Sequence, residues 1–176
     1  LGHRWPWEAF ADLGRRLEQY AGVRLVITGN HDERALAVRI AKRLTHSAIA
    51  AGTLSLGQMA CVLRRCRLFI ANDSGPIHLA ASLDVPLVAL LGPTDPHQYG
   101  PYPLDRANQR ILQAVPCAPC YRNRCRGHEA LARLPVSAVF GAAQAILEGN
   151  APRGLVQVPA RRRVLHVHTV PVVSGS

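Results

Sequence analysis

The sequence predicts a protein of the α/β class, in which a parallel β-sheet carries helices on both faces. Segments with helical apolar spacing alternate with short aliphatic segments along most of the 176 residues. This alternation is typical of parallel sheets whose connecting helices lie on either face. Apolar residues make up 48% of the chain but aromatic residues only 5%, so we expect an aliphatic core. The length suits one domain with a full-sized core.

The first half of the chain opens with a helix and continues with strands and helices in turn. Pro6 suits a first helical turn, and the apolar residues after it recur three or four apart. Asp32 and Glu33 lie at the start of the next helix, where the helix dipole favours acids. Thr53 or Ser55 can cap the third helix. We expect helices at 6–21, 31–44 and 55–66, and strands at 23–28 and 46–51.

In the second half, an aliphatic strand runs directly into a polar turn that starts at Asn72. A short helix, another aliphatic strand and a closing helix follow with the same kinds of apolar spacing. We expect strands at 68–71, 86–91 and 111–114, and helices at 77–83 and 137–147.

The chain is strongly basic, with 21 Lys and Arg against 11 Asp and Glu and a net charge of +10. Such a charge favours anionic partners: nucleotides, nucleic acid or an acidic membrane surface. The arginines are scattered through the helices and aromatic residues are scarce, which argues against nucleic acid. The other interpretation is peripheral contact with anionic lipid headgroups. No apolar run in the sequence approaches the roughly 20 residues that span a bilayer.

Several common catalytic motifs are absent from the sequence. It contains no Gly-x-x-x-x-Gly-Lys-Ser/Thr, Gly-x-Gly-x-x-Gly, His-Glu-x-x-His or Gly-x-Ser-x-Gly pattern. These absences weigh against an ATPase, a dehydrogenase, a metalloprotease and a serine hydrolase.

The most informative loop follows the strand at 68–71 and leads into a helix. Ligands of parallel α/β sheets bind beyond the carboxyl ends of the strands. Backbone N–H groups near Ser74 and Gly75, together with the positive helix end, make a site for a phosphate or diphosphate. His78, one turn into the helix, could reach the same anion, whereas Asp73 suits sugar hydroxyls.

A purely structural interpretation of this loop is open as well. Asn72 or Asp73 would then cap the helix, and Gly75 and Pro76 would only turn the chain. His78 would be a core histidine with satisfied hydrogen bonds. The physical chemistry of these residues alone favours neither interpretation.

This segment, taken with others along the chain, resembles glycosyltransferase family nine, the lipopolysaccharide heptosyltransferases. The resemblance covers roughly residues 3 to 148. It rests on Arg4-Trp5-Pro6, Asp73-Ser74-Gly75-Pro76-x-His78-Leu79-Ala80-Ala81, Val85-Pro86, Gly92-Pro93-Thr94-Asp95-Pro96, Gly100-Pro101-Tyr102 and Cys117-x-Pro119-Cys120-Tyr121.

The resemblance implies a fold and an architecture. Members of the family have the GT-B architecture, two facing Rossmann-like domains with the active site between them. The C-terminal domain binds the nucleotide-sugar donor, and the N-terminal domain holds the acceptor and an Asp that acts as general base. This chain resembles the C-terminal half only. We therefore expect the catalytic base in a missing N-terminal domain and no catalytic residue within this chain.

The resemblance also implies which residues bind the donor. The diphosphate and sugar would contact Asp73, Ser74, Gly75, Pro76 and His78, with Thr94 and Asp95 lining the same cleft. The nucleobase would lie against Thr53 and Leu54, with Met59 behind them, and Glu33 resembles an acid expected near the donor. One position departs from the family pattern. The Lys that usually lies two residues before the Trp of Trp-Pro is His3 here, with Arg4 beside it.

The function implied is the donor-binding half of an inverting glycosyltransferase that acts in lipopolysaccharide or other cell-surface glycan assembly, with ADP-heptose as a candidate donor. The alternatives are a stand-alone nucleotide-binding module and a nucleotide-sugar epimerase-like protein. The resemblance implies no cofactor and no metal. It places the protein in the cytoplasm, peripheral to the inner face of the inner membrane, with the fragment alone inactive.

The chain divides into three parts by composition. We expect a nucleotide-sugar-binding, Rossmann-like domain over 1–150 and a linker rich in Arg, Pro and Gly over 151–163. Residues 164–176 are either a disordered tail or the start of a further module, because they resemble the opening strand of a family-four glycosyltransferase. The chain begins with Leu1 rather than Met, so we expect it to be a piece of a longer protein.

A cluster of thiols and one imidazole could bind zinc. Cys117, Cys120, Cys125 and His128 have the short spacing of a tetrahedral site. A single Cys-x-x-Cys without a second one is a moderate signal, and the family resembled transfers sugars without a metal. We therefore favour reduced, structural cysteines over a metal site.

Overall fold

The chain forms an α/β fold in a computed structural model that describes residues 4–113, 131–150 and 154–157. Its helices are α1 (Trp7–Ala21), α2 (Arg34–Ala41), α3 (Leu56–Leu63), α4 (Gly75–Ser82), α5 (Pro96–Tyr99) and α6 (Val136–Leu147), with a 3₁₀ turn at Leu131–Arg133. Its strands are β1 (Leu25–Ile27), β2 (Ser47–Ile49), β3 (Phe69–Asn72), β4 (Leu87–Leu91), β5 (Gln109–Gln113) and β6 (Gly154–Gln157).

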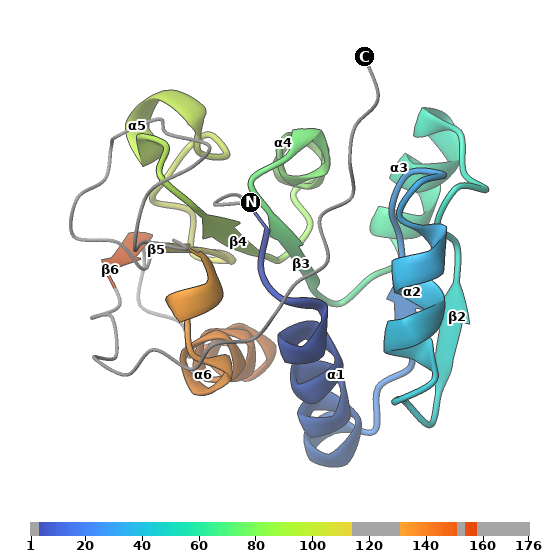
Figure 1. The fold of residues 1–176 in the computed structure, drawn as a ribbon. Helices are drawn as coiled ribbons and strands as arrows, with labels where there is room; N and C mark the ends of the chain where they lie inside the picture. The colour runs from blue at the N-terminus through green and yellow to red at the C-terminus, as the bar shows by residue number, and fades with distance from the viewer. Residues whose placement is uncertain (1–3, 114–130, 151–153, 158–176) are drawn as a thin grey trace.

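The strands form two parallel sheets. The larger has the order β3-β4-β5-β6, and β1 pairs with β2 in the smaller. Figure 1 shows β6 and β2 on opposite sides of the molecule, with the strands of the larger sheet between β6 and the centre. All strand pairs among the described residues are parallel, so their carboxyl ends meet at common edges of the sheets.

Two aliphatic clusters cover the two faces of the larger sheet, and β4 contributes to both. Val88 and Leu90 pack into a cluster with residues of α1 and α6. Leu87, Ala89 and Leu91 point the other way, into a cluster with residues of α3 and α4. All five side chains are fully buried, as expected of a strand covered on both faces. The predicted fold class is confirmed.

Several elements differ from the prediction at their ends. The helix predicted over 31–44 begins at Arg34, because Asn30 and Glu33 close a turn before it. The helix predicted over 77–83 begins at Gly75. Helix α5 is a single turn in a Pro-rich loop, too short to show apolar periodicity.

The segment predicted as a linker contributes a strand. Residues Gly154–Gln157 pair in parallel with β5, in the register Arg110 with Gly154. The larger sheet therefore extends past residue 150, whereas the division of the chain into three parts stays a prediction. Cys117, Cys120, Cys125 and His128, for which reduced structural cysteines are expected rather than a zinc site, and residues 164–176 lie outside the described residues.

Candidate functional site

The first turn of α4 lies at the carboxyl end of β3 and has no side-chain cap among the described residues. Ser74 is the N-cap residue, with an extended backbone (φ −161°). Its hydroxyl does not cap the helix but donates to the carbonyl of Asn72 at 3.0 Å. Ser74, rather than Asn72 or Asp73, occupies the N-cap position and makes no capping hydrogen bond, so the helix end keeps its partial positive charge toward solvent.

The side chains around this helix end are open to solvent. Ser74, Gly75, Pro76 and His78 are all exposed, whereas Ile77 on the same turn is fully buried in the core. His78 is therefore not a core histidine. The turn presents one apolar side chain to the core and its polar side chains, Ser74 and His78, to solvent.

Asp73 and Thr94 join the loops after β3 and β4. The Thr94 hydroxyl donates to Asp73 Oδ2 at 2.5 Å, and the Asp73 amide donates to the Leu90 carbonyl at 2.9 Å. Beneath them, the buried amide of Gln113 donates to the carbonyls of Gly92 and Thr94 at 3.1 and 2.7 Å. Gln113 is a supporting residue that sequence reasoning missed, because nothing local marks it.

Asp95 serves the structure of its own loop. It is the N-cap of α5, and its carboxylate accepts from the His97 amide at 2.9 Å. The side chain is half-buried beside Thr94. Asp95 therefore shapes the turn that leaves the site.

The segment that precedes α1 passes along the same edge of the sheet. The Trp5 amide donates to Asn72 Oδ1 at 3.0 Å, and the buried indole donates to the Leu134 carbonyl at 2.9 Å. Arg4, next in the chain, forms an ion pair with Glu33 at 3.4 Å. Asn72 thus anchors this segment beside the loop that carries Asp73 and Ser74, a role that the sequence does not reveal.

Glu33 closes the turn between β1 and α2. Its carboxylate accepts from the Asn30 amide, and its own amide donates to Asn30 Oδ1, each at 2.9 Å. A Cβ at Gly29 would lie 2.9 Å from Glu33 Oε2, so a glycine lets the carboxylate lie against the backbone. Arg4 and this turn together hold Glu33 at the rim of the site.

The loop after β2 packs against the loop after β1. Gly52 has φ +72° and donates its amide to the Gly29 carbonyl at 2.9 Å, and a Cβ there would lie 2.8 Å from His31 Cα. Thr53 is exposed and donates to the Ala50 carbonyl at 3.0 Å.

The same loop leads into α3. Ser55 caps that helix in a capping box with Gln58, so of the two predicted caps Ser55 is the right one. Leu54 is half-buried and Met59 is buried in the core beneath the loop. Leu54 and Thr53 are therefore the members of the predicted nucleobase set that lie nearest to solvent.

The described residues show no group of three or more His, Cys, Asp or Glu side chains placed to hold a metal ion. Cys117, Cys120, Cys125 and His128 are not among these residues. Nor do the described helices include one long and apolar enough to cross a membrane.

The sequence is similar to those of known enzymes. A family model for glycosyltransferase family 9 (heptosyltransferase) matches residues 3–130. Lipopolysaccharide heptosyltransferase 1 of Pseudomonas aeruginosa is 40% identical over 122 residues, which cover 69% of this chain and 33% of that protein. Lipopolysaccharide heptosyltransferase 2 of Salmonella typhimurium is 35% identical over 98 residues, covering 53% of this chain and 28% of that protein. The chain thus spans about a third of the length of these relatives.

Solved structures agree with the sequence comparisons. A crystal structure of a family 9 glycosyltransferase from Veillonella parvula matches with a TM-score of 0.71 and 29% identity, over 84% of this chain and 42% of that one. The structure of Escherichia coli heptosyltransferase WaaC with ADP matches with a TM-score of 0.65 and 28% identity, over 84% and 40% of the two chains. From its sequence and its fold, the chain belongs to glycosyltransferase family 9, the family of the heptosyltransferases.

Proposed function

We propose that this chain is the donor-binding part of an inverting glycosyltransferase that transfers heptose from ADP-heptose in lipopolysaccharide or other cell-surface glycan assembly. One observation carries the proposal: the first turn of α4 has no side-chain cap, and Ser74, Gly75 and His78 lie exposed around it. Two related structures are described as E. coli heptosyltransferase WaaC with ADP and with ADP-2-deoxy-2-fluoro heptose. These relatives support the choice of donor.

The diphosphate would bind at the start of α4. The helix dipole and the amide of Gly75 offer positive charge and a hydrogen-bond donor, and the exposed His78 can add a second donor. Because Gly75 has no side chain and the space around it is open, a phosphate can approach the backbone closely. Pro76 fixes the first turn of the helix without offering an N–H that would need a partner.

The sugar would lie toward Asp73 and Thr94. Asp73 carries a negative charge that would repel a phosphate, whereas its oxygens can accept hydrogen bonds from sugar hydroxyls. The hydroxyl of Thr94 holds this carboxylate in one orientation, which favours one arrangement of the sugar. Asp95 shapes the loop just beyond.

The nucleobase and ribose would lie on the other flank, where the loops after β1 and β2 pack together. Thr53 and Leu54 would contact the base, with the buried Met59 supporting Leu54 from below. Glu33, held by Asn30 and Arg4, would lie near the ribose. Arg4 brings the positive charge that a diphosphate requires into the region where His3 replaces a lysine.

In the reaction, an acceptor hydroxyl attacks the anomeric carbon of the donor while the bond from that carbon to the diphosphate oxygen breaks. The proton of the hydroxyl passes to a base, which we propose is supplied by an N-terminal acceptor domain. This chain would stabilise the negative charge that develops on the leaving diphosphate. The proposed setting is the cytoplasmic face of the inner membrane, where the basic surface favours peripheral contact with anionic lipid.

Calorimetric titration of the chain with ADP tests the proposal. Hydrogen bonds to charged groups are worth about 1.5–3 kcal/mol, so the H78A variant should bind ADP about tenfold more weakly or worse. His46 is also exposed but precedes β2, away from α4, which makes H46A a matched control. Equal ADP affinity for H78A and H46A would refute the proposed diphosphate site.

A further inference from the structure

Strands β1 and β2 and the helix between them, α2, form a unit that packs apart from the larger sheet. β1 and β2 pair with each other and share no backbone ladder with the described strands of the larger sheet. Among the described residues, neither of the two core clusters includes a side chain from these three elements. Figure 1 shows α2 and β2 together at one side of the molecule. The position of this β1–α2–β2 unit is therefore not fixed by a continuous sheet or by a shared core.

Helix α1 attaches the β1–α2–β2 unit at the end away from the donor loops. Glu18, in the last turn of α1, accepts hydrogen bonds from the amides of Thr45 and His46 at 2.7–3.1 Å. His46 directly precedes β2, so these bonds lie at the amino end of that strand. Helix α1 also packs along α2, where two arginine side chains lie over the ring of Trp7. The amino end of the unit is thus fixed against α1.

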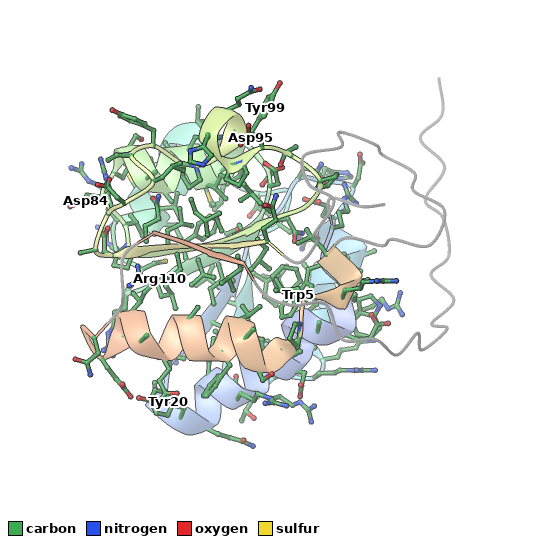
Figure 2. All side chains as sticks on the ribbon, turned by 90° about the vertical axis from the view of Figure 1, so that its left-hand side faces the viewer. Trp5, Tyr20, Asp84, Asp95, Tyr99 and Arg110 are labelled. Atoms are coloured by element: carbon green, nitrogen blue, oxygen red, sulfur yellow. The ribbon has the colours of Figure 1, made fainter. Side chains whose placement is uncertain are left out.

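At the ligand edge, the segment before α1 reaches the same unit. Trp5 belongs to the part built on the larger sheet: it is buried in the cluster on the α6 side, where Figure 2 shows it. Its indole donates to the Leu134 carbonyl, and its amide donates to Asn72 Oδ1 at the end of β3. Arg4, the preceding residue, forms its ion pair with Glu33 in the turn between β1 and α2. The Arg4–Glu33 pair therefore joins the two parts beside the donor loops.

The proposed donor spans both parts, since its base and ribose lie at the loops after β1 and β2 and its diphosphate lies at α4. A ligand that contacts two parts binds more tightly when their separation is already set, because less conformational entropy is lost on binding. We propose that Arg4 is a positioning residue, which holds Glu33 and so fixes the two halves of the donor site relative to each other before the donor binds. This inference rests on the proposed function for the path of the donor.

Positioning by Arg4 and a direct phosphate contact alone predict opposite effects of the E33Q substitution. E33Q removes the charge that holds Arg4 but keeps an oxygen that can accept from the Asn30 amide. If Arg4 positions the unit, ADP should bind to E33Q about two- to fivefold more weakly, the size expected of an exposed ion pair. If Arg4 serves only as a cation for the diphosphate, E33Q frees that cation and removes a nearby negative charge, so ADP should bind more tightly.

Calorimetry with probes that occupy one half each separates positioning from direct contact. E33Q should bind adenosine like the parent chain and pyrophosphate no more weakly, because neither probe spans both parts. Equal losses of adenosine and ADP affinity would make Glu33 a ribose ligand and overturn the positioning role. D12N is the matched control, since Asp12 forms exposed ion pairs with Arg15 and Arg16 within α1 at 2.9 and 3.2 Å. D12N should bind ADP like the parent chain, and a loss equal to that of E33Q would also overturn the proposal.

Hydrogen exchange of the chain without ligand tests the Arg4–Glu33 pair separately. R4Q removes the ion pair but leaves the hydrogen bonds between Glu33 and Asn30 in place. Amides of α2 and of the turn before it should exchange faster in R4Q, whereas amides of β3, β4 and β5 should exchange as in the parent chain. Equal exchange in R4Q and the parent overturns the positioning role, even when ADP binding and its dependence on His78 persist. If the parent chain binds no ADP, the proposed function fails instead, and hydrogen exchange alone decides whether Arg4 positions the unit.

Discussion

The hydroxyl of Thr94 donates a 2.5 Å hydrogen bond to the carboxylate of Asp73, and this contact joins the loops that follow two neighbouring strands. Gln113, on the next strand, holds the backbone of Thr94 from below. The carboxylate therefore has its direction set by residues from three strands. A side chain fixed in this way can distinguish one sugar orientation from another, because it does not rotate to meet the ligand.

Replacing Thr94 by Val removes the hydroxyl while nearly preserving the shape of the side chain. A single neutral or charge-assisted hydrogen bond is worth about 0.5–3 kcal/mol, so ADP-heptose should bind about 2- to 150-fold more weakly to T94V. T94S keeps the hydroxyl and should bind like the parent chain. Calorimetric titration measures both affinities, and equal Kd values for T94V and T94S would show that Asp73 needs no such support.

Local sequence patterns predicted the elements that build the site better than the contacts that orient it. The aliphatic strand ending at Asn72 and the polar turn after it could be identified, because burial periodicity and turn residues are local signals. The contacts of Asn72 with Trp5 and of Gln113 with Thr94 join residues 67 and 19 positions apart. Such pairs depend on how the elements pack, and no local pattern encodes them.

The same distinction explains two elements that the sequence did not indicate. Helix α5 consists of only four residues, Pro96–Tyr99, which is too short to show a helical spacing of apolar residues. Its first turn is stabilised by the Asp95 carboxylate, which accepts a hydrogen bond from the His97 amide. Strand β6, Gly154–Gln157, lies in a segment rich in Gly, Pro and Arg that reads as a linker. It is ordered by pairing with β5, which is a tertiary effect that overrides local composition.

Asp84 should tolerate substitution only by residues that accept a left-handed backbone. Its φ is +57°, and its carboxylate accepts from Arg106 and Asn108 at 3.0 and 3.2 Å. D84A loses both contacts and adds strain, so we expect a loss of about 1–3 kcal/mol in the free energy of unfolding. D84N retains an oxygen acceptor and suits this backbone better, so it should lose less. Urea denaturation compares the two, and an equal loss would contradict this explanation.

Arg110 is a buried cation whose removal should stabilise the chain. Its residue is 1% exposed, and its Nε and Nη2 have no hydrogen-bond partner in the structure described here. It lies on β5, on the α6 side of the sheet in Figure 2, and burial lowers the pKa of the guanidinium. R110M fills similar space without a charge, so we expect its free energy of unfolding to exceed that of the parent chain by about 1–3 kcal/mol.

A matched variant separates charge from volume at this position. R110A removes the charge but leaves a cavity, so it should be less stable than R110M. Thermal and urea denaturation give both values. A loss of stability in R110M would show that the hydrogen bonds from Nη1 to the carbonyls of Gln109 and Ala107 outweigh the cost of burying the charge.

The hydrogen bond between Tyr20 of α1 and Glu148, which follows α6, should make the stability of the chain depend on pH in both acid and strong alkali. The Tyr20 hydroxyl donates to the Glu148 carboxylate, which lowers the pKa of Glu148 below its ordinary 4.5 and raises the pKa of Tyr20 above its ordinary 10.0. The Glu148 contribution is present above pH 4.5 and is lost as the pH falls through its lowered pKa. The Tyr20 contribution is present below pH 10.0 and is lost as the pH rises through its raised pKa.

The Y20F variant removes this hydrogen bond but keeps the ring that packs edge-on against Phe140 at 5.7 Å. Its melting temperature should therefore lie below that of the parent chain near neutral pH, and the gap should close at both acidic and strongly alkaline pH. E148Q keeps an acceptor oxygen that does not titrate, so the difference in melting temperature between it and the parent should disappear in acid, where Glu148 of the parent becomes protonated. Melting curves across this pH range check both variants. A gap between Y20F and the parent that stays constant into strong acid would mean that packing, not the hydrogen bond to Glu148, accounts for the effect of Tyr20.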